Sequence, residues 1–331
     1  MDSLTDRSRL LILSGGTLVL LSFAIWGRAA EATTGHTARV ETDLLQVVIA
    51  DNEAYGSEHR AGYNGISELW LKAGDARNLF VPLYAGLNFE HIFSGDSASF
   101  GWNIFEPRRA PMQLVRLSDT KVELRQNRTE HWPLRSRLVY EAKGDAIDFA
   151  YLGTPLEDAW RKHGYIGVFF ASYIQSPEDM SIQFIGRSRP GQGDPRPRWI
   201  KHLPERHGLA ANHRPAGSTW DPSLDEGFNI DLVNGTSNLE YLYPFYLGRV
   251  GENVLVMMFE RAGEEGELRF AQSPSGGGKG NPAWDYVYFR REYRVGREFS
   301  FRVRAVYTKF TSVEEIVRLY EAWSGEKVKL P

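Results

Sequence analysis

Cysteine is absent from the 331 residues of the chain. Disulfide bonds, thiolate metal sites and cysteine nucleophiles are therefore excluded. A strong charge of one sign is also missing, because the net charge is -3 and charged residues make up 24% of the chain. Nucleic acid is therefore not an expected partner. The sequence contains no G-x-S-x-G motif, Walker loop or G-x-G-x-x-G motif, and we expect no cofactor.

The first 32 residues differ in composition from the rest. Arg7 and Arg9 precede a mostly apolar, uncharged run from 10 to 26, and Ala30-Glu31-Ala32 matches an A-x-A cleavage pattern. The length of the run lies between that of a signal peptide and that of a short membrane span. We expect residues 1–32 to be a signal peptide or, if uncleaved, an N-terminal membrane anchor. The protein would then be exported to the periplasm, the cell surface or the medium, and would touch a membrane only through this segment.

After residue 42, short apolar runs alternate with turns that contain Gly and Pro, a pattern typical of β-rich domains. Phe299, Phe301 and Val303 alternate with polar residues, a period of two that predicts a strand with one buried face. Further strands are predicted at 44–50, 79–83, 138–142, 146–152, 166–174, 180–185, 239–250, 253–260, 267–272 and 284–289. We predict that residues 33–331 form a single all-β domain, a large antiparallel β-sandwich. Strand should cover about 40% or more of residues 42–310.

One helix is predicted near the C-terminus. Ser312 and Glu315 form a capping box, and Gly325 is placed to end the helix. The residues that form its apolar stripe are Val313, Ile316, Val317, Tyr320 and Trp323. We expect this helix to pack on the sandwich as a brace.

The segment 187–222 is predicted to be a long loop at the edge of the sandwich. Between residues 187 and 214 it holds seven basic and two acidic residues, in a chain whose net charge is negative. Arginine suits the two-pronged binding of carboxylate or sulfate. The segment is either a solvated loop paired with acidic neighbours or a rim that holds an acidic or polyhydroxylated ligand. Arg206 and His207 are its candidate ligand contacts.

Two histidines directly follow glutamates near predicted strand ends. They form the pairs Glu90-His91 and Glu130-His131. A carboxylate and a neutral imidazole that converge from different strands can act as a general acid/base pair. Because adjacent residues of a strand point to opposite faces, we expect only one member of each pair to face a given pocket. The alternative is that each histidine is structural.

Tryptophan is abundant, with nine residues. A flat apolar ring with a polar N–H suits the face of a pyranose, although a core position is the leading explanation for any single tryptophan. The tryptophans placed at turns or loop edges are Trp102, Trp132, Trp199, Trp220 and Trp284. We expect at least one of these rings to face a ligand.

The acidic residues and histidines do not have the spacing of a metal site. Asp221, Asp225 and Asp231 do not match an EF-hand loop. His202 and His207 are five residues apart, which differs from the spacing of a helical ligand pair. We therefore expect no bound metal.

Three segments follow one another in a familiar order. Tyr63-Asn64-Gly65-Ile66 opens a long meander, Glu130-His131-Trp132-Pro133-Leu134 leads into a strand, and Ala283-Trp284-Asp285-Tyr286 precedes the last strand. Over about residues 42–324 this order resembles the supersandwich of the galactose mutarotase-like superfamily. Sugar epimerases, several polysaccharide lyases and domains of glycoside hydrolases share that fold. The resemblance implies a carbohydrate ligand, with His131 and Glu260 nearest to the catalytic histidine and late glutamate of the epimerases.

We therefore predict a carbohydrate-active enzyme of the lyase, hydrolase or epimerase type. His131 or His91 would act as general acid and Glu260 or Glu90 as base. Arg135 and the basic segment would hold a substrate that could itself be acidic. The other candidate substrate contacts are Trp102, Trp132, Arg206, His207 and Trp284.

The alternative function is a non-catalytic glycan-binding or cell-envelope protein, in which the same aromatic rings bind sugar without chemistry. An enzyme needs a carboxylate and an imidazole near one atom of the bound sugar, whereas a binding module needs only the rings. For the enzyme we expect His91, His131, Arg135 and at least one of Arg206 and His207 to face a single cavity.

Overall fold

The computed structural model describes residues 31–32, 35–54, 62–73, 77–97 and 101–331, without the side chains of 31, 32, 101 and 102. Strand accounts for 45% of the structure and helix for 8%. The prediction of a β-rich chain with a C-terminal helix is therefore confirmed. The predicted export segment lies almost entirely outside the described residues. Among the described residues, no helix combines the length and the apolar character needed to cross a membrane.

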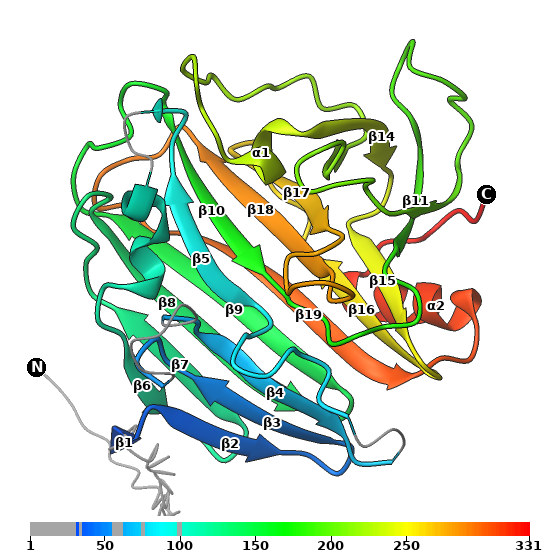
Figure 1. Ribbon diagram of the computed structural model, residues 1–331, viewed down its shortest axis with the longest axis horizontal. Coiled ribbons are helices and arrows are strands. Elements are labelled where there is room, and N and C mark those ends of the chain that lie inside the picture. Colours follow the sequence, from blue (N-terminus) through cyan, green and yellow to red (C-terminus); the bar gives the residue numbers. More distant parts are fainter. Residues whose placement is uncertain (1–30, 33–34, 55–61, 74–76, 98–100) are drawn as a thin grey trace, which may run out of the picture.

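Most strands belong to one 16-stranded sheet that folds back on itself (Figure 1). Its pairings are antiparallel except for one parallel pair, β13 with β14. The strands of the rear layer are β6 (Gln113–Arg116), β7 (Lys121–Gln126), β8 (Leu134–Lys143), β9 (Ala146–Pro155), β19 (Phe299–Lys309), β16 (Asn253–Phe259), β15 (Phe245–Val250) and β11 (Ile182–Ser188). The strands of the front layer are β14 (Thr236–Tyr241), β13 (Asn212–Pro215), β17 (Gly266–Ser273), β18 (Ala283–Arg291), β10 (Tyr165–Ala171) and β5 (Asn88–Phe93). Two short strands complete the sheet, β1 (Glu31–Ala32) beside β6 and β12 (Arg198–His202) beside β11.

Aromatic side chains fill the space between the two layers. Phe170 of β10 stacks on Tyr286 of β18, with ring centroids 5.2 Å apart. The same ring meets Phe149 of β9 at 5.4 Å and Phe301 of β19 at 5.7 Å. These contacts join the front strands to the rear strands, so the predicted sandwich is confirmed.

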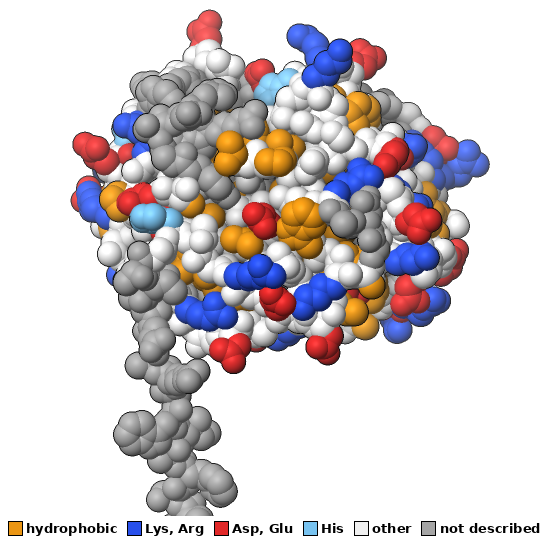
Figure 2. Space-filling model, turned by 60° about the horizontal axis from the view of Figure 1, so that its bottom comes forward, with side chains coloured by type: hydrophobic (Ala, Val, Ile, Leu, Met, Phe, Trp, Pro, Cys, Tyr) orange, Lys and Arg blue, Asp and Glu red, His pale blue; other side chains and the backbone are white. Residues whose placement is uncertain are grey.

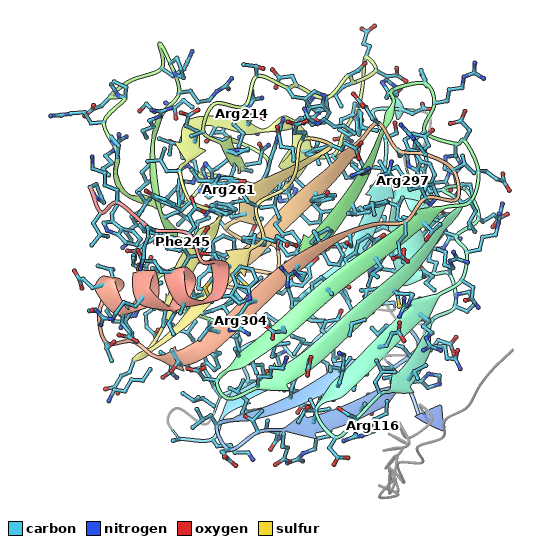
Figure 3. All side chains as sticks on the ribbon, turned by 180° about the vertical axis from the view of Figure 1, so that it is seen from behind. Arg116, Arg214, Phe245, Arg261, Arg297 and Arg304 are labelled. Carbon is cyan, nitrogen blue, oxygen red and sulfur yellow. The ribbon has the colours of Figure 1, made fainter. Side chains whose placement is uncertain are left out.

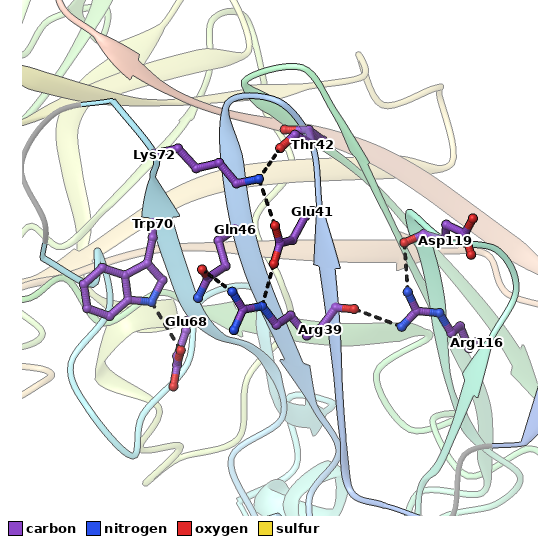
Figure 4. A network of polar contacts seen from close by, with 9 residues as sticks. All are labelled: Arg39, Glu41, Thr42, Gln46, Glu68, Trp70, Lys72, Arg116 and Asp119. Carbon is purple, nitrogen blue, oxygen red and sulfur yellow. Dashed lines mark hydrogen bonds and ion pairs between the residues drawn. The ribbon is translucent and has the colours of Figure 1, made fainter.

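A three-stranded sheet of β2 (Thr37–Glu41), β3 (Leu45–Ala50) and β4 (Gly65–Leu71) completes the lower part of the molecule (Figure 1). Its alternate apolar residues join the main core. Its outer face carries a polar network in which Glu41 pairs with Arg39 at 2.7 Å and with Lys72 at 2.8 Å (Figure 4). Acidic and basic side chains are interspersed over the lower surface (Figure 2).

The predicted C-terminal helix is α2 (Val313–Ser324), which lies on the rear of the sheet beside Phe245 (Figure 3). Ser312 Oγ accepts the backbone N–H of Glu315 at 3.2 Å, and Gly325 ends the helix with φ 74°. Tyr320 packs on Phe245, with ring centroids 4.7 Å apart. The capping signals and the apolar stripe therefore predicted both the helix and its packing.

Three of the predicted segments have a different structure. The segment 239–250 is not one strand, because residues 242–244 separate β14 from β15. Residues 79–83 are not a strand, because only Phe80 makes a β-bridge and the chain then turns at Pro82 and Leu83. Leu83 has φ 66°, a backbone conformation incompatible with a strand. The segment 187–222 is not an open loop, because it contains β12 and β13 and pairs with the sheet through both.

Candidate functional site

A cavity of about 250 Å³ lies on the outer face of the front layer. Its floor comes from β5, the end of β10 and β18, which contribute Glu90, His91, Tyr173 and Asp285. Its walls come from the 3₁₀ segment η2 (Gly101–Arg108) and from residues around the short helix α1 (Asp231–Asn234). These segments lie over the upper part of the front layer (Figure 1).

Glu90 and His91 both line this cavity, although they are neighbours on one strand. The register between β5 and β10 shifts at this point, so that His91 pairs with Phe169, Phe89 pairs with Phe170, and Glu90 has no partner. Glu90 is thus the extra residue of a β-bulge, a feature that re-aims side chains and is frequent beside functional sites. The expectation that only one of the two faces the pocket is wrong, because it assumed an uninterrupted strand.

The Glu90 carboxylate is held in place by the side chains of Tyr173 and Arg108. Tyr173 Oη donates a hydrogen bond to Glu90 Oε2 at 2.6 Å, and Arg108 Nη1 lies 3.5 Å from Oε1. Arg108 in turn lies over the ring of Tyr63, 4.0 Å from its centroid. Burial raises the pKa of Glu90, while the Arg108 charge and the Tyr173 hydrogen bond oppose this shift. The pKa of Tyr173 is itself raised by burial and by Glu90, so this hydroxyl stays protonated and donates.

Asp285 is the second carboxyl group of the floor, and only 1% of its surface is exposed. Its Oδ1 accepts the backbone N–H of Ser172 at 2.9 Å. Burial raises the pKa of Asp285 well above its usual value, and the nearby charge of Glu90 adds to the shift. Sequence reasoning missed this residue, although an aspartate inside an apolar strand run was a usable signal.

His91 is buried and carries no charge at neutral pH. Burial, with a smaller contribution from the Arg108 charge, lowers the pKa of His91 to about 3. Its ring packs against Phe105 at 4.5 Å and Phe169 at 5.2 Å, measured between centroids. Nδ1 has no hydrogen-bond partner among the described residues. The predicted role of His91 as a protonated acid therefore does not fit its surroundings.

The mouth of the cavity is polar and its walls are largely apolar. His207 is exposed at the rim, where its Nδ1 lies 3.0 Å from Ser273 Oγ. Asp231 is exposed beside it. The apolar wall residues are Ile104, Phe105, Ile230 and Leu232.

His131 lies outside this cavity. It lines a separate hollow of about 830 Å³ on the other side of η2, together with Asn103 and Glu106. Its backbone N–H and that of Trp132 both donate to the Glu106 carboxylate, the second at 2.8 Å. The expectation of one cavity holding both histidines is wrong, because η2 packs between them: Phe105 contacts His91 while Asn103 contacts His131.

The other charged candidates are also separated from the cavity. Arg135 is exposed on β8, between the buried residues Leu134 and Ser136, and so faces away from the core of the sandwich. Glu260 is exposed after β16, where it pairs with Arg302 at 2.8 Å. Arg206 is exposed in the turn after β12.

Of the three tryptophans predicted to contact the substrate, two belong to the core. Trp132 is buried and stacks on Trp160, with ring centroids 5.4 Å apart. Trp284 is fully buried and its Nε1 donates to the carbonyl of Met180 at 2.9 Å. The side chain of Trp102 lies outside the described part of the structure. In the described ranges, no group of three or more His, Asp and Glu side chains has the geometry to hold a metal ion.

The chain matches no family model and no curated protein. Similar solved structures include a galactose mutarotase-related enzyme from Lactobacillus acidophilus, with 10% identity and a TM-score of 0.43 over 83% of this chain and 98% of that one. An α-N-acetylgalactosaminidase from Bifidobacterium bifidum matches with 10% identity and a TM-score of 0.48, over 86% of this chain and 38% of that one. A heparan sulfate lyase from Pedobacter heparinus matches with 9% identity and a TM-score of 0.35, over 86% of this chain and 37% of that one.

Proposed function

We propose that the protein is a carbohydrate-active enzyme that transfers protons to and from a single sugar unit in the cavity of Glu90 and Asp285. The observation that carries the proposal is that two buried carboxyl groups share one small cavity. Buried titratable groups with shifted pKa values, lying in a cleft, are typical of acid/base catalysts. The carbohydrate class rests on the sequence resemblance and on the polar floor and apolar walls of the cavity.

The two carboxyl groups have different surroundings and therefore different roles. Arg108 and Tyr173 stabilise the ionised form of Glu90, which makes Glu90 the general base. Asp285 has no such cation and its pKa is raised well above the usual value, which makes it the general acid. Two acids whose pKa values are pushed apart can divide these roles at one pH.

The size of the cavity favours one sugar unit over a polymer. Its volume of about 250 Å³ lies just below the range of typical small-molecule sites, which span roughly 300–1,000 Å³. Phe105 in the wall offers an aromatic ring beside the polar floor, an arrangement that suits the apolar face of a sugar. The reaction would be epimerisation, or cleavage at the end of a chain.

The test is to incubate the purified chain with a panel of mono- and oligosaccharides. Anomeric exchange, new reducing ends and unsaturated products are followed in parallel. Glu90→Gln and Asp285→Asn should each lower turnover at least about 100-fold. Glu260→Gln, which changes an exposed glutamate far from the cavity, is the matched control and should keep full turnover.

The outcomes separate the enzyme from the alternative. Sugar binding without turnover of any panel member would identify a non-catalytic glycan-binding protein. Absence of binding to every sugar would overturn the carbohydrate assignment. A loss of turnover is assigned to chemistry only if the two variants melt at temperatures close to that of the unchanged chain.

We also propose that the chain is exported through residues 1–32. The support is the uncharged run from 10 to 26 followed by Ala30-Glu31-Ala32. Mass spectrometry of the native protein should find an N-terminus close to Thr33. An intact N-terminus retained in the membrane fraction would instead show that the segment is an anchor.

A further inference from the structure

We infer, on the basis of the proposed function, that the sugar bound in this cavity is not an acid and that an amino sugar binds most tightly. The distribution of charge around the cavity carries this inference. The inference departs from the sequence-based expectation that the ligand could be acidic.

Three carboxyl groups line the cavity, Glu90 and Asp285 in the floor and Asp231 at the mouth. No lysine or arginine is among the described lining residues. The nearest cation, Arg108, lies against Glu90 and over the ring of Tyr63. His91 adds no positive charge, because burial lowers its pKa to about 3.

The basic segment does not supply the missing cation, because none of its lysines and arginines is among the described lining residues and several of them are paired elsewhere. Their acidic partners lie outside the cavity lining. The pairs are Arg187 with Glu240, Arg196 with Asp194, Lys201 with Asp179 and Arg214 with Asp221. The segment is thus largely a structural element paired with acidic neighbours, the first of the two alternatives that its composition allowed.

A negatively charged sugar would add its charge to a site in which the charge of Glu90 already raises the pKa of the neighbouring Asp285. Such like-charge contact inside a partly dry cavity is unfavourable and excludes ligands effectively. The ammonium group of an amino sugar has the opposite effect, because its positive charge is attracted to the carboxylates of Glu90 and Asp231.

Isothermal titration with matched sugars tests this inference. The series are glucose, glucosamine and glucuronate, and galactose, galactosamine and galacturonate, at a pH where the amine is protonated. We expect the amino sugar of at least one series to bind at least about tenfold more tightly than its uronate. N-acetylglucosamine and N-acetylgalactosamine, which lack the positive charge, should lose the advantage over the parent sugar.

Asp231→Asn removes the carboxylate at the mouth while keeping its size. This variant should reduce the ratio of amino-sugar to uronate affinity several-fold, whereas Glu260→Gln should leave the ratio unchanged. High salt should also reduce the ratio, because it screens exposed charges.

The results distinguish failure of this inference from failure of the proposed function. Uronates that bind as tightly as amino sugars, or more tightly, would overturn the inference and leave a carbohydrate enzyme. A ratio that Asp231→Asn does not change would remove Asp231 from the argument and overturn the charge-based explanation. If none of the sugars binds, the proposed function itself is wrong.

Discussion

At the residue scale, Glu90 has the largest effect on the candidate site. As an extra residue in β5 it brings two consecutive side chains to one face, which regular alternation forbids. Asp285 obeys the alternation of side chains along a strand. Trp284 points into the core and Asp285, the next residue, points into the cavity. The alternation rule was therefore sufficient in β18 and misleading in β5.

Glu106 illustrates a buried carboxylate with a structural role. It accepts the backbone N–H groups of His131 and Trp132, and it is itself buried. Glu106→Ala leaves both donors without this partner and should lower the free energy of unfolding by about 2–4 kcal/mol. Urea denaturation measures the change, with exposed Glu130→Ala as a control that should shift it by less than about 0.5 kcal/mol. Equal effects of the two substitutions would contradict this role.

At the element scale, η2 decides which residues share a cavity. It packs against β5 and contributes Phe105 to one hollow and Asn103 to the other. The two Glu-His pairs of the sequence look alike, yet this segment gives them different surroundings. The segment 187–222 shows a similar effect, because β12 and β13 turn an apparently open loop into part of the sheet.

The helix α2 should be sensitive to the loss of its cap. Ser312→Ala removes the Oγ acceptor for the Glu315 N–H and should destabilise the protein by about 1 kcal/mol. Ser312→Asp, which keeps an acceptor, should restore most of this stability. Both changes are measured by chemical denaturation, and an unchanged midpoint for Ser312→Ala would show that the cap contributes nothing.

At the scale of the whole molecule, the sandwich buries ionisable groups in surroundings that disfavour their charged forms. His213 is fully buried, its Nδ1 lies 2.7 Å from Ser237 Oγ, and burial lowers its pKa well below the usual value. Since the folded-state pKa lies below the unfolded value of 6.5, His213 contributes stability above pH 6.5 that is lost as the pH falls below it. Glu90 and Asp285 have raised pKa values and contribute in the opposite sense, so the effect of His213 must be isolated by substitution.

His213→Asn provides that isolation. When the pH is lowered from 7.5 to 5.5, the free energy of unfolding of the unchanged chain should fall by about 1.4 kcal/mol relative to that of this variant. Denaturation at several pH values measures the shift. His36→Asn is the opposing control, because Asp51 raises the pKa of His36 and its contribution should grow as the pH falls. A His213 difference that is constant with pH would show that the imidazole is not buried in the neutral form.

The sequence by itself determined several elements of this protein. Period-two alternation predicted β19, and the capping box predicted α2. These signals act between near neighbours in the chain, through side-chain direction, backbone conformation and local hydrogen bonds. They are therefore visible in one sequence.

Only the tertiary structure decided which residues meet in the candidate site. Glu90, Tyr173 and Asp285 are far apart in sequence and come together because β5, β10 and β18 are neighbours in one sheet. Strand order depends on contacts across the whole core, and the bulge at Glu90 depends on the register against β10. Local patterns carry neither the strand order nor the register, which is why Asp285 was missed and His131 was assigned to the wrong cavity.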